Sequence, residues 1–244
     1  MSDQEKYIDS FEKITSFPKY IEVVSQISEE IASENMTALF RGDRDKKDLL
    51  PRIATIKNVG NIPDLEKALF DEFKRQSYRY LDRVPQNNYE WIALAQHHGL
   101  PTRLLDWTEN LLVGLWFCVA NGPKGKENGV VWIYAVEKDD YVNLEEDKPF
   151  EIEKTKVFCP NQIDDRIGSQ HSWFTVHKYM DQKKKFIPLN KNATYKKRVF
   201  QVVIANSLFV KFKESLILCG INQNTIFPSL DGLCQYLKDK NGIK

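Results

Sequence analysis

Residues 130–136 constrain the fold more than any other segment of the chain. They form a continuous run rich in residues that favour β-structure, Val-Val-Trp-Ile-Tyr-Ala-Val, directly after Gly129. Such a run, bounded by a glycine, predicts a buried strand. Shorter segments of similar character at residues 156–158, 173–176 and 199–205 predict further strands in the second half of the chain.

Before residue 129 the pattern is helical. Residues 18–34 begin at a proline and repeat apolar side chains at helical spacing, which predicts an amphipathic helix. We expect a second helix capped by Asp64 and carrying apolar residues to Leu81, and a third at residues 89–98. Residues 111–120 are apolar throughout except for Gly114, and they are far short of the roughly 20 that a membrane span needs, so they predict a central buried helix.

Residues 37–40 form a short apolar segment that predicts one early strand, and residues 207–219 and 230–238 predict two late helices, the last capped by Ser229. No linker rich in proline, glycine or serine divides the chain. The sequence therefore predicts a single α+β domain, in which a helix-rich N-terminal half packs on a mostly antiparallel sheet from the C-terminal half.

The charge of the chain is balanced overall, with 35 Lys and Arg against 34 Asp and Glu. This balance argues against binding of nucleic acid over the whole surface. Locally, residues 137–153 hold eight acids and two lysines, and residues 183–198 hold seven basic residues and no acid. Such runs are typical of solvated faces, and the alternative is that the basic run contacts phosphate on a nucleotide, a nucleic acid or a partner protein.

The beginning of the sequence lacks a basic start followed by an apolar stretch, so we expect no secretory signal. The four cysteines are spread singly, without the paired spacing of a zinc site or a disulfide framework. These features predict a reduced, cytoplasmic protein that makes no membrane contact.

Polar side chains are densest at residues 96–108. A predicted helix ends in Gln96-His97-His98, turns at Gly99-Leu100-Pro101, and continues into a predicted loop with Thr102, Arg103 and Asp106. Such a helix end with its loop is where sites are often built. The structural alternative is that Arg103 and Asp106 form a buried pair, Thr102 is a cap and Trp107 belongs to the core.

Histidines point to the same region. Three of the four follow a glutamine closely: His97 and His98 after Gln96, and His171 after Gln170. This grouping favours one polar pocket, because histidine is an acid, base or ligand near neutral pH. For the fourth, His177, we favour a structural role.

The sequence lacks the common catalytic signatures, namely a nucleophile elbow, a P-loop, a dinucleotide fingerprint and a metalloprotease helix. Two adjacent histidines do not readily chelate from one helix face, so we predict no metal site. The remaining cluster of donors suits an anion or a nucleotide phosphate, because a guanidinium offers it two hydrogen bonds. Arg41, beside Gly42, is the strongest candidate, and its alternative role is a salt bridge with Asp43, Asp45 or Asp106.

Several segments resemble the FRG-domain family, which is named for its Phe-Arg-Gly motif. The resemblance rests on Phe40-Arg41-Gly42, on Leu49-Leu50-Pro51-Arg52, and above all on the block from Gln96 to Thr108. Arg166, Gln170, Phe174-Thr175 and His177 are similar to a third family block, and residues 225–233 to a closing element. It implies an FRG-type domain at residues 35–240 behind an N-terminal helical extension at residues 1–34.

The family is mainly bacterial and phage-associated, often near mobile or defence genes. Its pattern is loosely similar to that of ADP-ribosyltransferases, in which an arginine on an early strand holds the phosphates of NAD. The resemblance implies this role for Arg41 and names NAD as a possible substrate. Such enzymes generally need a late glutamate, for which Glu90, Asp106 and Asp231 are the possible substitutes here.

We therefore predict an enzyme of bacterial or phage defence that acts on NAD or another nucleotide. The alternatives are a non-catalytic ligand-binding or sensor module that uses the same pocket and binds a nucleotide or a partner protein, and a metal-dependent hydrolase or nuclease. The predicted catalytic residues are Arg41, Gln96, His97, Arg103 and Asp106. The predicted substrate-binding residues are Gly42, His98, Thr102, Arg166, Gln170 and His171. We expect the three motif blocks to meet in one cleft.

Overall fold

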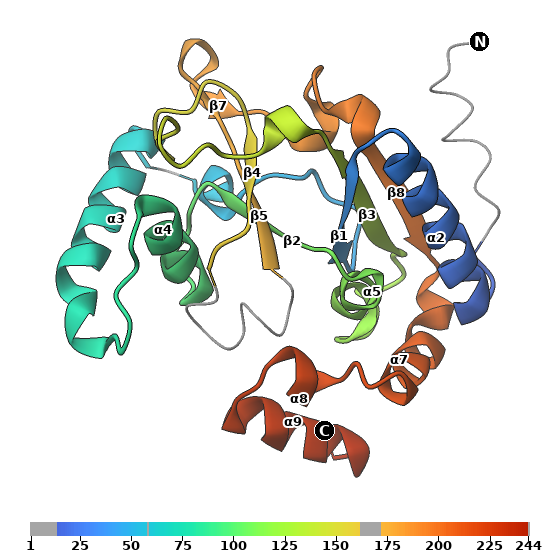
Figure 1. Ribbon diagram of the computed structural model, residues 1–244. Coiled ribbons are helices and arrows are strands. Elements are labelled where there is room, and N and C mark those ends of the chain that lie inside the picture. Colours follow the sequence, from blue (N-terminus) through green and yellow to red (C-terminus); the bar gives the residue numbers. More distant parts are fainter. Residues whose placement is uncertain (1–13, 58, 162–171, 244) are drawn as a thin grey trace.

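The computed structural model describes residues 14–57, 59–161 and 172–243 (Figure 1). Its helices are α2 (Phe17–Ser33), α3 (Ile62–Ser77), α4 (Asn88–His97), α5 (Leu111–Val119), α7 (Phe209–Leu218), α8 (Gln223–Ile226) and α9 (Leu230–Lys240). Its strands are β1 (Thr37–Asp43), β2 (Leu104–Thr108), β3 (Gly129–Val136), β4 (Lys156–Phe158), β5 (Ser172–Val176), β6 (Tyr179–Met180), β7 (Lys185–Phe186) and β8 (Val199–Ile204).

Six of these strands form one sheet in the order β4-β5-β2-β1-β3-β8, and every neighbouring pair is antiparallel. The remaining two strands, β6 and β7, form a separate short hairpin. The predicted α+β class with one domain is therefore confirmed. β3 is buried at every position, as its continuous apolar run predicts.

The two central strands, β2 and β1, come from the first half of the chain, where the sequence predicts mainly helices. The prediction of a loop at residues 102–106 is wrong for its second part, because β2 begins at Leu104 and pairs with β5 along its whole length. β1 also continues past Phe40 to Asp43, because β3 offers it a partner at every position as far as Val130. Tertiary pairing thus overrides the weak local preference of these polar residues.

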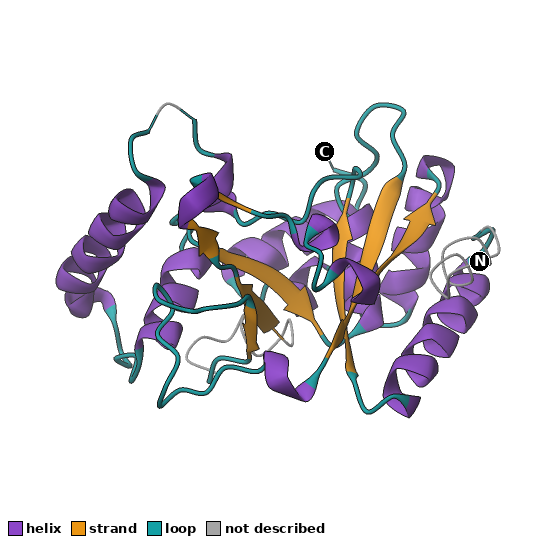
Figure 2. Cartoon of the chain, turned by 90° about the horizontal axis from the view of Figure 1, so that it is seen from above, coloured by secondary structure: helices purple, strands orange, loops and turns teal. Residues whose placement is uncertain are grey.

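The two faces of the sheet are covered differently, and alternate residues of a strand enter different parts of the core. Phe40 and Ile133 pack into a core shared with α2, α5 and α7, whereas Leu39 and Tyr134 pack on the opposite face. A third core packs α3 and α4 against β2, β4 and β5. Figure 2 shows the strands crossing the middle of the molecule, with helices at both ends.

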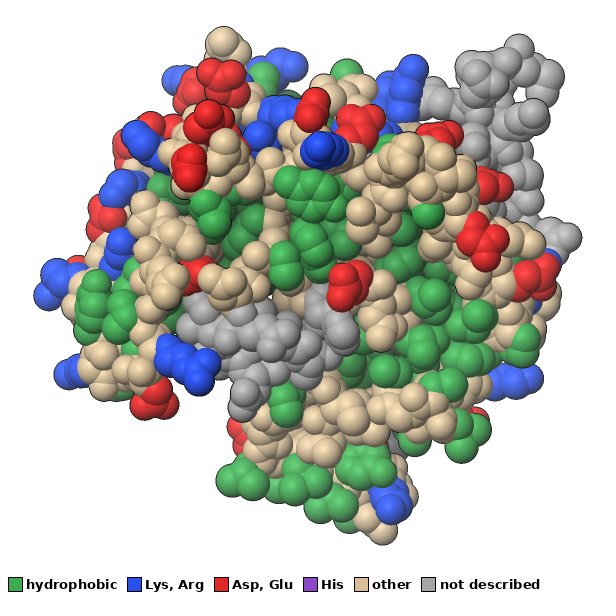
Figure 3. Space-filling model, in the orientation of Figure 1, with side chains coloured by type: hydrophobic (Ala, Val, Ile, Leu, Met, Phe, Trp, Pro, Cys, Tyr) green, Lys and Arg blue, Asp and Glu red, His purple; other side chains and the backbone are tan. Residues whose placement is uncertain are grey.

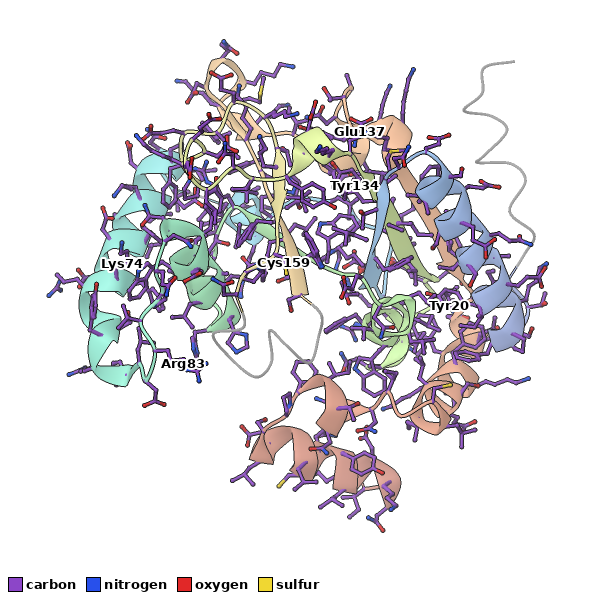
Figure 4. All side chains as sticks on the ribbon, in the orientation of Figure 1. Tyr20, Lys74, Arg83, Tyr134, Glu137 and Cys159 are labelled. Atoms are coloured by element: carbon purple, nitrogen blue, oxygen red, sulfur yellow. The ribbon has the colours of Figure 1, made fainter. Side chains whose placement is uncertain are left out.

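Of the two predicted helix caps, Ser229 is confirmed and Asp64 is not. The side chain of Ser229 accepts a hydrogen bond from Gly232 N–H and caps α9, as predicted. Asp64 is not the cap of α3: Asn61 holds that position, and Asp64 lies in the first turn, where a carboxylate favours the positive end of the helix dipole. The hydroxyl of Tyr20 in α2 donates a hydrogen bond to the carbonyl of Leu111 at the start of α5, and this bond links the two helices (Figure 4).

The α8–α9 segment lies at the edge of the molecule, and hydrophobic side chains gather on its outer side (Figure 3). No helix in the described part of the chain is both long and apolar enough to cross a membrane.

Helix α5 lies very close to β1. A Cβ atom at Gly42 would lie 2.0 Å from the carbonyl oxygen of Gly114 and 2.4 Å from the backbone nitrogen of Cys118. Both obstacles are backbone atoms and cannot rotate away. Only glycine at position 42 therefore lets α5 lie directly on β1.

We expect Gly42→Ala to lower the free energy of unfolding by about 3 kcal/mol or more, because α5 must move off the strand. Gly60→Ala is the control, since a Cβ atom there meets nothing within 4 Å, and its effect should stay within about 0.5 kcal/mol. Urea unfolding of both variants measures the difference. Equal effects would show that the helix has room to adjust.

Candidate functional site

A pocket of about 780 Å³ lies where β1 and β2 part from one another. The two strands share the single register pair Phe40 and Thr108, whereas β1 follows β3 from Thr37 to Asp43. The parting of the strands leaves a gap between the end of β1 and the start of β2, and residues of both line the pocket. The walls are completed by the end of α4, the segment after β1, Phe117 of α5 and Phe227 after α8.

Arg41 spans the gap between the two strands. Its Nη1 donates to the backbone carbonyl of Asp106 at 3.0 Å, in the place where a strand pair would make a backbone bond. Its Nε and Nη2 donate to the two carboxylate oxygens of Asp43, each at 3.3 Å. The carboxylate of Asp106 lies 3.8 Å from Nη1. Of the alternative salt-bridge partners, the structure places Asp43 and Asp106 beside Arg41, while Asp45 pairs with lysines.

Gln96 binds the carboxylate oxygen of Asp106 that does not face Arg41. Its Nε2 donates to Asp106 Oδ1 at 3.1 Å and to the carbonyl of Leu104 at 3.3 Å. Its Oε1 accepts a hydrogen bond from the hydroxyl of Thr102. The side chain of Asp106 is 61% exposed, so a fixed carboxylate faces the pocket and remains open to a ligand.

The end of α4 sets the direction of Gln96 and His97. The N–H of Leu100 donates to the carbonyl of Ala95, and the N–H of Gly99 donates to that of Gln96. Gly99 has a φ of +86°, which a residue with a Cβ atom adopts only with strain. This Schellman motif ends the helix and turns the chain towards β2. His97 lines the same pocket as Arg41.

Arg103 does not reach the pocket. Its side chain is 2% exposed, and its Nε and Nη2 donate to Glu66 Oε2 at 2.9 and 2.7 Å. Its backbone N–H binds the other oxygen of Glu66, and its Nη1 donates to the carbonyl of Pro149. The guanidinium also lies 5.0 Å from the ring centre of Phe150. The partner of Arg103 is thus Glu66 of α3 rather than Asp106.

Some of the predicted site residues line the pocket and others do not. Arg41, Gly42, Gln96, His97 and Asp106 line the pocket. Thr102 is buried behind Gln96, and His98 is exposed at the end of α4; neither is part of the pocket wall. Arg166, Gln170 and His171 lie outside the described residues, so the convergence of the third block is traced only through Ser172, which lines the pocket.

Among the three possible substitutes for a catalytic glutamate, only Asp106 lines the pocket. Glu90 is 3% exposed and accepts hydrogen bonds from Gln86 N–H and from the side chain of Asn161. Asp231 lies in the first turn of α9. Of these three carboxylates, the geometry therefore leaves Asp106 as the one with access to a ligand.

His177 lies beneath the site and is fully buried. Its Nε2 is 3.1 Å from the hydroxyl of Thr175, which also accepts from the indole of Trp107. Its Nδ1 has no hydrogen-bond partner among the described residues. Burial, together with the positive charges of Arg41 and Arg103, lowers the pKa of His177 to about 3. The histidine is therefore neutral at physiological pH.

The comparison with family models now identifies the region. The model of the FRG domain matches residues 36–127. The chain therefore contains an FRG domain. The matched range runs from the start of β1 to the segment between α5 and β3. It includes Arg41, Gln96 and Asp106, so the family pattern coincides with the first two motif blocks around the pocket. Searches of curated proteins and of solved structures gave no match.

Sequence reasoning missed several residues of the pocket wall. Lys47, Asp48 and Arg52 follow β1, and Phe117 belongs to the apolar segment that predicts only a core helix. Arg52 lies in a motif that the family resemblance includes, which is the one signal that could have marked it. Phe117 carries no such signal, because an aromatic side chain in an apolar helix is usually core, whereas Phe227 lies in the closing element that the resemblance includes.

We expect Arg103→Met to lower the free energy of unfolding by about 3–5 kcal/mol, because it leaves the buried carboxylate of Glu66 without its cation. Arg75→Met is the matched control, since Arg75 pairs with Glu72 through side chains that are 69% and 51% exposed, and should cost less than about 1 kcal/mol. Chemical denaturation at pH 7 measures both. A stable Arg103→Met protein that has lost ligand binding would instead indicate a role in the pocket.

Stability should also depend on pH through His177. Its folded pKa of about 3 lies below the unfolded value of about 6.5, so the unfolded chain holds more protons between these values. The stability gained from neutral His177 is complete above pH 6.5 and is lost as the pH falls towards 3. The difference in unfolding free energy between wild type and His177→Gln should fall by up to about 1.4 kcal/mol per pH unit in that window. A difference that does not change with pH would contradict the assignment.

Proposed function

We propose that this FRG-domain protein binds NAD or a closely related nucleotide in the pocket between β1 and β2, and breaks the bond between its nicotinamide and ribose. The observation that carries the proposal is the carboxylate of Asp106, which is open to the pocket and held by Gln96 and Arg41. Transferases of this chemistry need such a group beside the sugar. The setting of bacterial or phage defence, which the resemblance implies, is part of the same proposal.

In the proposed reaction, the bond between ribose C1′ and the nicotinamide nitrogen breaks, and its electron pair leaves with the now neutral nicotinamide. Positive charge develops on the ribose, and the Asp106 carboxylate stabilises it. A nucleophile, either water or an acceptor group, then adds to C1′ and gives its proton to Asp106 or to solvent. Fixed charges of this kind need no reorganisation during the reaction, which is why they contribute strongly to catalysis.

The dimensions and lining of the pocket support a ligand of nucleotide size. Its volume of about 780 Å³ falls within the range of about 300–1,000 Å³ that is usual for small-molecule sites. Its wall combines charged side chains with Phe117 and Phe227, whose rings meet edge to face at 6.2 Å. A nucleotide carries the matching groups, since it joins anionic phosphates to flat aromatic rings.

The second candidate function is a binding or sensor module that recognises a nucleotide without changing it. One observation favours it: no glutamate is among the described residues that line the pocket. For the metal-dependent alternative, the described residues contain no group of three or more His, Cys, Asp or Glu side chains arranged to hold an ion. We therefore keep binding without turnover as the alternative to be tested.

We expect the wild-type protein to release nicotinamide from NAD and Asp106→Asn to do so at least about 100-fold more slowly, because the amide cannot balance the charge of the ribose. Mass spectrometry of the products measures the release. Asp82→Asn, an exposed position outside the pocket, is the control and should match the wild type.

A thermal-shift measurement with NAD separates the two candidates, since a ligand that binds the folded state raises the melting temperature. A shift with NAD recovered intact would favour the sensor module. No shift and no turnover would contradict both.

A further inference from the structure

The charges that line the pocket are unequally paired. Among the described residues, the lining cations are Arg41, Lys47 and Arg52, and the lining carboxylates are Asp43, Asp48 and Asp106. Counted by residue type, the wall is neutral. Its affinity for an anion depends, however, on which cations already have a carboxylate partner.

Two of the three cations already have a carboxylate partner. Arg41 binds both oxygens of Asp43 and lies beside Asp106, so two negative charges surround its guanidinium. Lys47 lies 2.8 Å from Asp45, a buried carboxylate outside the pocket wall that also binds Lys124 at 2.8 Å. A phosphate that approaches Arg41 would meet these carboxylates as well, and like charges repel.

Arg52 is different. Its guanidinium makes one hydrogen bond to a described residue, from Nη1 to the carbonyl of Gly99 at 3.3 Å, and no described carboxylate lies within ion-pair distance. A guanidinium carries five N–H donors, so four remain for a ligand. Arg52 is exposed, and it lines the pocket together with Arg41.

The backbone that carries Arg52 is fixed in place. Arg52 begins a short 3-10 helix between two buried residues, Pro51 and Ile53. The N–H of Ile53 donates to the carbonyl of Thr102, which immediately precedes the buried Arg103. This bond ties the Arg52 segment to the chain that leads into β2, so the base of the side chain keeps its place relative to Asp106.

We propose that Arg52 binds the phosphate or diphosphate group of the ligand, while Arg41 holds the two strands together and positions Asp106. The inference rests on the proposed function, because it assigns one part of the nucleotide to one residue. It differs from the role that the family resemblance implies, which gives the phosphates to Arg41. An unpaired guanidinium is the better site, since it can make two parallel bonds to phosphate oxygens without competing carboxylates.

Calorimetry with three probes tests this assignment: NAD, ADP and nicotinamide, which has no phosphate. We expect Arg52→Gln to weaken the binding of ADP and NAD about 10- to 100-fold and to leave that of nicotinamide unchanged. Arg52→Lys should recover part of the loss, because it restores the charge but not the paired geometry. Arg83→Gln, at an exposed arginine after α3 and outside the pocket, is the control and should bind all three like wild type (Figure 4).

The outcomes separate this inference from the proposed function. If wild type binds NAD and ADP, and Arg52→Gln binds them equally well, the assignment of Arg52 is wrong and the proposed function stands. If Arg52→Gln weakens nicotinamide as much as ADP, the residue supports the pocket as a whole and the phosphate assignment is again wrong. If wild type binds neither nucleotide, the proposed function fails and this inference fails with it. A melting temperature for Arg52→Gln close to that of wild type shows that any loss is not due to unfolding.

Discussion

The bond from Arg41 to the carbonyl of Asp106 connects the two halves of the sheet. Because β1 and β2 share only the register pair Phe40 and Thr108, their backbone groups beyond it need other partners. Arg41 supplies one, and it does so without closing the gap that forms the pocket. Adding more strand pairs would have closed that gap and removed the site. The same guanidinium therefore stabilises the sheet and determines where Asp106 lies.

The FRG motifs thus divide between two tasks that sequence alone does not separate. Gly42 allows α5 to lie on β1, and Arg103 neutralises the buried Glu66, so both serve the fold. Gln96 and Asp106, by contrast, are linked to one another at the pocket wall, and Asp106 remains exposed. Its exposure keeps this carboxylate hydrated, while the hydrogen bond from Gln96 and the nearby guanidinium of Arg41 fix its position.

Long-range pairing also connects the acidic run of the sequence to the basic run. Arg198, at the end of the basic run, reaches back to the acidic run: its Nη1 binds Asp140 at 2.5 Å and its Nη2 lies 3.5 Å from Glu137. Asp140 is 2% exposed and also accepts from the hydroxyl of Tyr134. The acidic and basic runs are therefore not solvated throughout, because Arg198 and Asp140 form a buried ion pair between them. In the pocket, no carboxylate of the described residues pairs with Arg52, which sequence order cannot reveal.

The sequence by itself determined the elements in which the local preference of the residues matches their place in the fold. Examples are the buried strand at residues 130–136 and the helix ended by Gly99. It also determined the α+β class. The sequence also singled out Arg41, Gln96 and Asp106, which line one pocket in the structure. Only the tertiary structure decided that residues 104–108 form a central strand and that Arg103 pairs with Glu66, 37 residues away. Local preference reflects neighbours within a few residues, whereas strand pairing and ion pairing depend on partners that folding brings together.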